Sequence, residues 1–357
     1  MSDGPPVLSA RALGRATLAR QGLLERTEVS VTQACERFGG FQAQEARPPA
    51  LGLWNRVAGF EVEQLRRAAK RGTVVRAVLM RGTIHLVSAK DFAWMRPTVQ
   101  PVLSGGMRYP GIEDLDLPKV LQAARALLAD EPRTFGALRD ALSERFPGEE
   151  PRALGSAVRL SLPLTMVPTG DPWGWPPDSR FALAETGGED PAALLRRHLA
   201  AFGPATAADV QAWSGLKGMK DVIAGMADEL VEVRDERKRT LWDLPSAPRP
   251  GEDAAAPARF LPSWDSVVMA HKDRTRVVPE EHRAKLTSKN LRVLPAFLWD
   301  GIVAGLWGLE TKKGTATLEV RPFARLPRGA RGALEAEAEA ALAFAAPDAK
   351  RRAVTFA

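Results

Sequence analysis

The chain has 357 residues, of which 45% are hydrophobic and 26% charged, so it is long enough for two or three domains with sizeable cores. Its formal net charge of +7 and its pI of about 9.8 suit a polyanionic partner. Because Cys35 is the only cysteine, an intramolecular disulfide is excluded. The chain also lacks an apolar run of about 18 residues and a secretory signal at its start, M-S-D-G-P-P, so we expect a cytoplasmic protein with no membrane partner.

The first part of the chain predicts several helices followed by a two-stranded hairpin. The periodicity favours helices at 8–24, 27–38, 50–60 and 62–71, and strands at 74–80 and 83–87. Between the second and third helices, Gly39-Gly40 is expected to break the helical pattern. Pro48-Pro49 is expected to stop any helix that follows. Helices followed by a hairpin is the sequence order of a winged helix-turn-helix.

The same order occurs twice more, as a repeat of pattern without sequence identity. The second round predicts helices at 117–129, 135–146 and 151–162, with strands at 164–167 and 180–184. The third round predicts helices at 191–201, 206–213 and 217–230, with strands at 231–233 and 240–242.

The last part of the chain changes character after a linker rich in Pro and Ala at residues 245–258. Strands are expected at 258–261, 267–269, 291–294, 297–299, 302–309, 315–320 and 354–356, and a helix at 330–345. Asp300-Gly301 is a strong hairpin-turn signal. The resulting prediction is an α+β chain with modules at 1–112, 113–187 and 188–246 and a β-domain at 257–357.

Two glutamines stand out between the glycine and proline pairs. Gln42 and Gln44 are separated by Ala43 alone, so in an extended segment both side chains point the same way. Each amide offers two donors and an acceptor, which is unusual equipment for an apolar core. From the pattern alone, the competing interpretation is a pair of surface or capping residues.

Several enzyme classes lack their motifs. The four histidines are scattered, and no C-x-x-C or H-x-x-x-H spacing exists, so we expect no metal site. No glycine-rich phosphate loop, G-x-S-x-G elbow or zinc-deaminase motif is present, and we expect no cofactor.

Four segments together resemble the AlkZ-like bacterial DNA glycosylases of the winged-helix superfamily, in the Q-x-Q subgroup. They are Q-A-Q at residues 42–44, L-M-R-G-T-I-H-L-V at 79–87, W-D-S-V-V-M-A-H-K-D-R at 264–274 and D-G-I-V-A-G-L-W at 300–307. The resemblance implies three tandem winged helix-turn-helix modules and a C-terminal β-domain that form a C-shaped cradle around duplex DNA.

The resemblance also implies an activity. The expected enzyme is a monofunctional DNA glycosylase that hydrolyses the N-glycosidic bond of bulky N7-alkylguanine adducts, including interstrand crosslinks, in base excision repair and antibiotic self-resistance. It would act as a monomer on double-stranded DNA that carries alkylated guanine, in the nucleoid. Gln42 and Gln44 are the predicted catalytic residues. The predicted DNA contacts are Arg47, Arg81, His85, Lys217 and Lys220.

Alternatives remain open at these positions. Arg81 and His85 also fit an exposed turn arginine and a structural histidine, and Lys217 and Lys220 fit a solvated helix face. Trp173 and Trp175 fit either stacking on a base or flat adduct, or packing on a neighbouring module. For the whole chain, the alternative function is a non-enzymatic winged-helix DNA-binding protein or transcription regulator.

Overall fold

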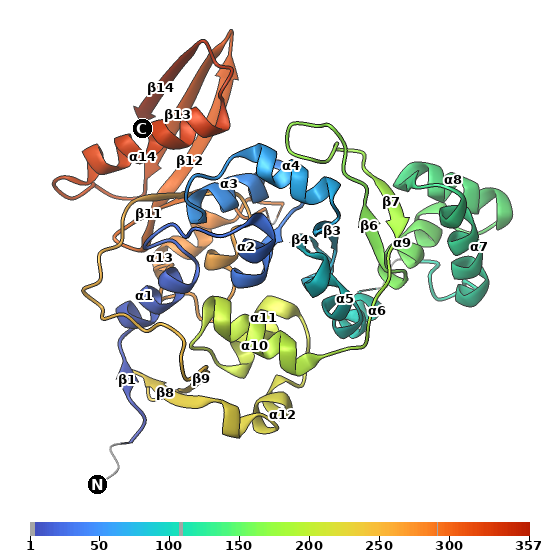
Figure 1. Cartoon of the computed structure of the whole chain (residues 1–357), viewed down its shortest axis with the longest axis horizontal. Coiled ribbons are helices and arrows are strands. Elements are labelled where there is room, and N and C mark those ends of the chain that lie inside the picture. The colour runs from blue at the N-terminus through green and yellow to red at the C-terminus, as the bar shows by residue number, and fades with distance from the viewer. Residues whose placement is uncertain (1–3, 107–109, 291) are drawn as a thin grey trace.

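The computed structural model describes residues 4–106, 110–290 and 292–357, and its architecture is mixed α+β (Figure 1). The first three residues of the chain and Leu291, in an expected strand, lie outside the described residues. Within the part that is described, no helix is both long and apolar enough to cross a bilayer.

The N-terminal region contains the glutamine pair between two helices. Its elements are β1 (Val7–Leu8), α1 (Ala10–Arg20), α2 (Val31–Arg37), β2 (Phe41–Gln42), α3 (Arg47–Arg56), α4 (Val62–Lys70), β3 (Val74–Val78), the 3₁₀ turn η1 (Met80–Gly82), β4 (Ile84–Ser88), α5 (Ala89–Thr98) and α6 (Gln100–Gly105). Ser30 and Gln33 form a capping box at the start of α2. The expectation that Pro48 and Pro49 stop a helix is wrong. Both lie in the first turn of α3, where a missing N–H removes no intrahelical bond.

The second region shares a sheet with the first. Its elements are α7 (Leu117–Asp130), β5 (Arg133–Thr134), α8 (Phe135–Arg145), α9 (Pro151–Ser161), β6 (Leu164–Met166) and β7 (Arg180–Leu183). The six strands follow the order β2-β4-β3-β6-β7-β5. Strands β3 and β6 pair antiparallel, with Arg76 opposite Met166, so the two hairpins expected in separate modules form one continuous sheet.

The third region pairs with the start of the chain. It consists of α10 (Pro191–Phe202), α11 (Ala207–Ser214), α12 (Met219–Ala224), the 3₁₀ turn η2 (Ala227–Glu229), β8 (Val231–Asp235) and β9 (Thr240–Asp243). The expected helix at 217–230 is shorter, because Gly218 adopts a φ of +80° and the chain tightens into η2 beyond α12. β1 adds to β8 in parallel, giving the sheet order β1-β8-β9.

The C-terminal region is a five-stranded sheet with α14 packed against it. Its elements are β10 (Arg259–Leu261), η3 (Ser266–Val268), α13 (Glu280–Arg283), η4 (Ala284–Leu286), β11 (Ala296–Trp299), β12 (Ile302–Lys312), β13 (Thr315–Pro322), α14 (Ala330–Ala345) and β14 (Arg351–Phe356). The strand expected at 267–269 is instead the 3₁₀ turn η3, which Asp265 caps. The Asp300-Gly301 turn is confirmed, with φ values of +50° and +76° as a type I′ turn requires.

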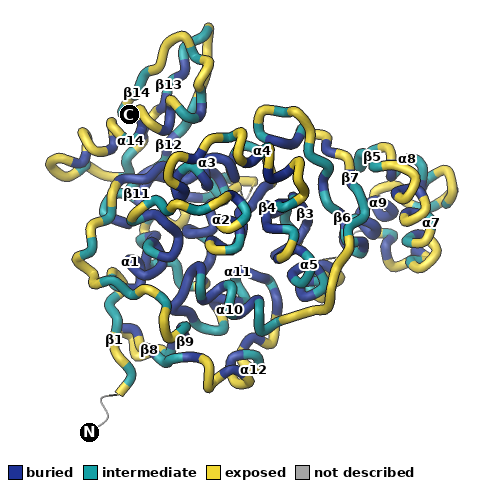
Figure 2. Tube along the Cα trace, in the orientation of Figure 1, coloured by how far each residue is buried: buried dark blue, intermediate teal, exposed yellow. Residues whose placement is uncertain are grey.

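Buried ion pairs join these regions through α1 and α3. Arg20 pairs with Asp243 of β9 at 2.7 Å, and Arg56 pairs with Asp265 at 2.7 Å; all four side chains are at most 1% exposed. Figure 2 shows the buried backbone gathered around α1, α2 and α11, with the exposed segments toward the periphery. Removing one partner of such a pair leaves an uncompensated charge in the interior, so these contacts fix how the regions dock.

Candidate active site

Gln42 ends the edge strand β2, which two glycines make possible, and Gln44 lies in the bend between β2 and α3. Gly39 and Gly40 have φ values of +74° and +76° and end the helical path of α2. A side chain on Gly40 would stand 2.7 Å from a methyl carbon of Val87, so only glycine lets β2 approach β4. Within this pairing, Gln42 lies opposite His85. Gln42 is 7% exposed, whereas Gln44 is exposed at the surface.

Both side-chain amides are held by their oxygens. Arg81 Nη2 donates to Gln42 Oε1 at 3.0 Å, and the backbone N–H of Ile84 donates to Gln44 Oε1 at 2.7 Å. Among the described residues, neither Nε2 group donates a hydrogen bond to the protein. Each amide therefore presents a free NH₂ group and one unused oxygen lone pair in a fixed orientation.

Arg76 supports the backbone of the same segment and was not singled out from the sequence. Its Nε donates to the carbonyl oxygen of Ala43 at 2.9 Å and its Nη2 to that of Gln44 at 3.1 Å. The side chain is 4% exposed, and burial lowers the pKa of Arg76 to about 10. It remains a cation at neutral pH and keeps the chain extended between the two glutamines. Its only sequence signal is a charged residue inside an apolar strand.

Arg81 is turned inward, toward Gln42. It occupies the left-handed region with a φ of +56°, and its guanidinium donates both to Gln42 Oε1 and to the carbonyl oxygen of Trp213 at the end of α11. Burial, together with the nearby charge of Arg274, lowers the pKa of Arg81 to about 10. Two of the five N–H donors of Arg81 are thus directed to the protein, and Arg81 links the glutamine segment to the third region.

His85 lies in the interior, which argues against the predicted DNA contact. It is 1% exposed, and its Nδ1 donates to the carbonyl oxygen of Thr83 at 3.0 Å. Burial and the charge of Arg81 lower the pKa of His85 to about 3, so the ring is neutral at physiological pH. The residue therefore supports the β3–β4 hairpin from within, and a contact with DNA would require it to leave the core.

The remaining predicted DNA contacts differ in how exposed their charged groups are and in whether they already have partners in the protein. Arg47 is half-buried, with its guanidinium 5.5 Å from the ring centre of Trp173 and its Nη2 donating to the carbonyl oxygen of Ala345 at 3.0 Å. Lys217 and Lys220, just before and within α12, are exposed, and in the described part of the chain they form no ion pair. The two lysines are available to an anionic partner in a way that Arg47 is not.

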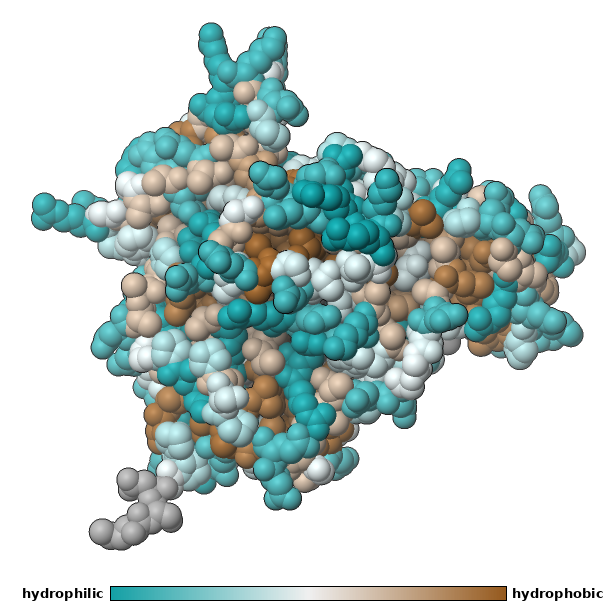
Figure 3. All heavy atoms as spheres, in the orientation of Figure 1, coloured by the Kyte–Doolittle hydropathy of each residue, from teal (hydrophilic) through white to brown (hydrophobic). Residues whose placement is uncertain are grey.

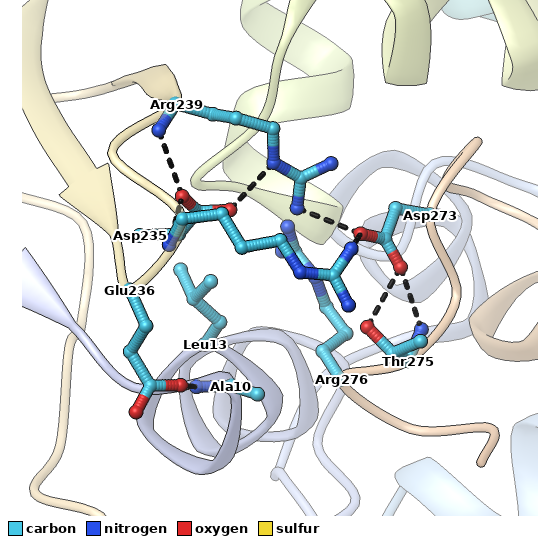
Figure 4. A pocket seen from close by; sticks show the side chains of 9 residues that line it. Ala10, Leu13, Asp235, Glu236, Arg239, Asp273, Thr275 and Arg276 are labelled. Atoms are coloured by element: carbon cyan, nitrogen blue, oxygen red, sulfur yellow. Dashed lines mark hydrogen bonds and ion pairs between the residues drawn. The ribbon is translucent and has the colours of Figure 1, made fainter. Parts of the chain in front are cut away.

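A polar hollow of about 100 Å³ elsewhere has a different character (Figure 4). It lies between α1, the β8–β9 turn and the segment at 273–276, and several of its charges are paired: Arg239 bonds Asp235 at 2.6 Å and Asp273 at 2.7 Å. Asp273 also accepts from the Thr275 hydroxyl at 2.7 Å. None of the glutamine-site residues lines this hollow, so we assign it to docking between regions.

Metal ligands and a reactive thiol are not found at this site among the described residues. Across residues 4–106, 110–290 and 292–357, no three His, Cys, Asp or Glu side chains gather as metal ligands. Cys35 is buried, and burial raises the pKa of its thiol well above its ordinary value, so it is not a thiolate at neutral pH. The two held amides therefore offer neutral hydrogen bonding, and the exposed carboxylate of Glu45, next to Gln44, pairs with Arg292 at 3.1 Å. Figure 3 shows apolar side chains gathered in the middle of one face of the molecule, bounded by hydrophilic ones.

Comparisons with known proteins agree on one family. The family described as "DNA glycosylase AlkZ-like" matches residues 35–344. The interstrand DNA cross-link repair glycosylase of Streptomyces sahachiroi is 23% identical over 367 aligned positions, which cover 90% of this chain and 92% of that protein. The solved structure of Streptomyces sahachiroi DNA glycosylase AlkZ matches with a TM-score of 0.78 at 21% identity, covering 98% of this chain and 100% of that chain.

Proposed function

This chain belongs to the AlkZ-like family of DNA glycosylases, and from that premise we propose that Gln42 and Gln44 carry out the hydrolysis of N7-alkylguanine nucleotides in duplex DNA. The observation that supports this proposal most directly is the fixed pair of amides. Both oxygens are held by protein donors, and both NH₂ groups are unused within the described structure.

The lesion itself explains why neutral amides suffice. N7 alkylation gives the base a positive charge, so the bond between C1′ and N9 breaks with its electron pair moving onto the base, which leaves as neutral N7-alkylguanine. Water adds to C1′ and loses a proton to solvent, giving an abasic sugar. The free oxygen lone pairs of Gln42 and Gln44 accept hydrogen bonds from this water and face the developing sugar cation with partial negative charge.

A carboxylate at either position would hold the water more strongly but would be repelled by the adjacent phosphates. A neutral glutamine avoids this repulsion, and the positive charge of Arg81 fixes the direction of the Gln42 amide without placing a negative group near the DNA. No lysine is required as a Schiff-base nucleophile, so the enzyme is proposed to be monofunctional and to leave the phosphodiester chain intact.

The mode of DNA binding is part of the same proposal. Helices followed by a hairpin occur three times, at α2–β4, α7–β7 and α10–β9, and we propose that these are tandem winged helix-turn-helix modules. With the C-terminal β-domain they would form a C-shaped cradle around one duplex, bound by a monomer. Lys217 and Lys220 would contact phosphates.

We further propose that interstrand crosslinks are substrates. The Streptomyces sahachiroi relative carries that activity in its name. A crosslink through two guanine N7 atoms presents the same charged leaving group at each end, so hydrolysis of either glycosidic bond releases one strand.

The test is incubation of the protein with a duplex that contains one N7-methylguanine, followed by alkali and strand analysis. A glycosylase yields strand cleavage at the lesion after mild alkali, above the level of the same duplex treated without protein, and none before alkali. A winged-helix regulator would shift the duplex in a binding assay and leave no abasic site, and that outcome would contradict the proposal. Gln122→Ala, an exposed glutamine on α7, serves as the matched control for substitutions at the site.

A further inference from the structure

A hollow of about 480 Å³ is lined by Arg47, which follows Gln44 by three residues. It is bounded by the starts of α3 and α4, the loop before β7, the β12–β13 hairpin and the end of α14. Figure 1 shows the loop before β7 beside α4 in the upper part of the view. The volume falls within the range of about 300–1,000 Å³ typical of small-molecule sites.

Aromatic rings form the wall of this hollow. The ring of Phe344 stacks on Trp54 with centroids 5.7 Å apart, and it lies 5.9 Å from Phe60 and 6.4 Å from Trp173. Trp173 remains half-buried, whereas Trp175 is 4% exposed and bonds Met166 through its indole N–H. Of the two tryptophans in this loop, Trp175 packs in the core and Trp173 faces the hollow.

Arg47 lines the edge of the hollow. Its guanidinium lies over Trp173, with the guanidinium carbon 5.5 Å from the ring centre, and one terminal nitrogen donates to the carbonyl oxygen of Ala345 at 3.0 Å. Stacked in this way, the flat guanidinium and the indole can cover the face of a bound ring.

The hollow is within reach of a lesion held at the glutamines. Arg47 follows Gln44 by three residues, so their α-carbons are at most about 10 Å apart. The rest of the lining is mixed: Val62, Pro172 and Pro347 are apolar, while the remaining side chains include the charged groups of Glu63, Arg66 and Asp348. A fused hydrocarbon ring can lie against the apolar part, beside Trp173 and Phe344, without needing hydrogen bonds at its edge.

We propose that this hollow binds a planar apolar ring system carried on the alkyl group of the lesion, an inference that rests on the N7-alkylguanine glycosylase function proposed above. The ring would insert beside Trp173 and Phe344, where the guanidinium of Arg47 lies over the indole. The hollow then determines which adducts are removed fastest, while the glutamines perform the hydrolysis common to all of them.

The experiment compares two duplexes, one with N7-methylguanine and one with N7-(pyren-1-ylmethyl)guanine, in single-turnover excision. Thr311→Trp places an indole in the hollow from an exposed position near the end of β12. Thr315→Trp makes the same substitution on β13, opposite Lys312 and therefore on the other face of the hairpin. We expect Thr311→Trp to lower the pyrenylmethyl-to-methyl rate ratio by about tenfold, and Thr315→Trp to leave it unchanged.

Trp173→Ala is a second test, because it removes an aromatic ring that lines the hollow instead of filling the space. It should also lower the pyrenylmethyl-to-methyl rate ratio. An unchanged ratio in both Thr311→Trp and Trp173→Ala would overturn the proposal. An equal loss on both substrates would overturn it too, because the hollow would then hold part of the DNA itself. Failure of the wild-type protein to remove N7-methylguanine would count against the proposed function instead, so the two failures are distinguishable.

Discussion

Replacing Arg81 by Met separates the two roles that the sequence and the structure give this residue. The sequence predicts a DNA contact, whereas the structure directs the guanidinium to Gln42 Oε1 at 3.0 Å and to the carbonyl oxygen of Trp213. Arg81→Met removes the donor that fixes the Gln42 amide. Because Met, like Arg, is not glycine, the backbone cost of the positive φ at this position stays similar.

The expected magnitude follows from the type of bond. A hydrogen bond from a charged donor contributes about 1.5–3 kcal/mol. If the ordered amide is needed only in the transition state, its loss appears as a roughly 10- to 150-fold fall in kcat with KM little changed. Arg81→Lys should fall between, because an ammonium group cannot reach both acceptors with the geometry of a guanidinium.

The assay is single-turnover excision of N7-methylguanine beside equilibrium duplex binding. Lys217→Met is the matched control, since that exposed cation is expected to change affinity and lower the salt slope by about one without changing the excision rate. The reasoning is refuted if Arg81→Met keeps its wild-type kcat and instead behaves like Lys217→Met, because Arg81 would then be a phosphate contact.

Three further predictions concern the scaffold. Asp265→Ala leaves the 1%-exposed Arg56 without its partner and should lower the free energy of unfolding by about 3–5 kcal/mol, read from urea denaturation; an effect below about 1 kcal/mol would contradict it. Burial lowers the pKa of His198 to about 4, below its value of about 6.5 in the unfolded chain. The neutral ring therefore contributes fully to the free energy of unfolding above pH 6.5, and this contribution is lost as the pH falls toward 4. Thermal unfolding should accordingly show a loss of about 3 kcal/mol across that window that His198→Gln lacks, and equal pH profiles would refute this. Gly40→Ala should separate β2 from β4, because its Cβ would stand 2.7 Å from Val87 and its φ of +76° disfavours Ala; we expect at least tenfold slower excision, with Gly72→Ala, also at positive φ but in open space, as the comparison.

Local chemistry accounts for the features that were predicted correctly from sequence. The Gly39-Gly40 break and the Asp300-Gly301 turn follow from residues that tolerate positive φ, and both occur as expected. Pro48 and Pro49 show the limit of such signals. A proline that ends a helix also fits its first turn, and only the position of α3 decides between the two.

Long-range partners explain what the sequence did not show. Strand β2 has only two residues, which is too few for a periodic signal in the sequence. It is defined by its pairing with β4, in which Gln42 lies opposite His85. His85 is buried because β4 pairs with β2 and β3 on both sides, and Arg81 turns inward to the carbonyl oxygen of Trp213 in the third region. Neither could be predicted from composition near the hairpin. Arg56 and Asp265 are 209 positions apart, so nothing local marks them as a pair.

The pairing of strands also changes how the modules are understood. The three rounds of helices and hairpin were predicted from periodicity, which reports local structure. The joining of β3 to β6 and of β1 to β8 depends on which apolar surfaces meet in the folded chain. A sheet that crosses from one round to the next makes the first two regions a single rigid support for the glutamine segment.

The central claim is that Gln42 and Gln44 act in hydrolysis and not in holding DNA. Its most direct test measures the single-turnover excision rate and the duplex affinity of Gln42→Ala and Gln44→Ala on the same N7-methylguanine substrate, with Gln122→Ala as the control. We predict that excision falls by at least about a hundredfold in both site variants while affinity stays within about threefold of wild type. Wild-type excision rates in both variants would contradict the claim.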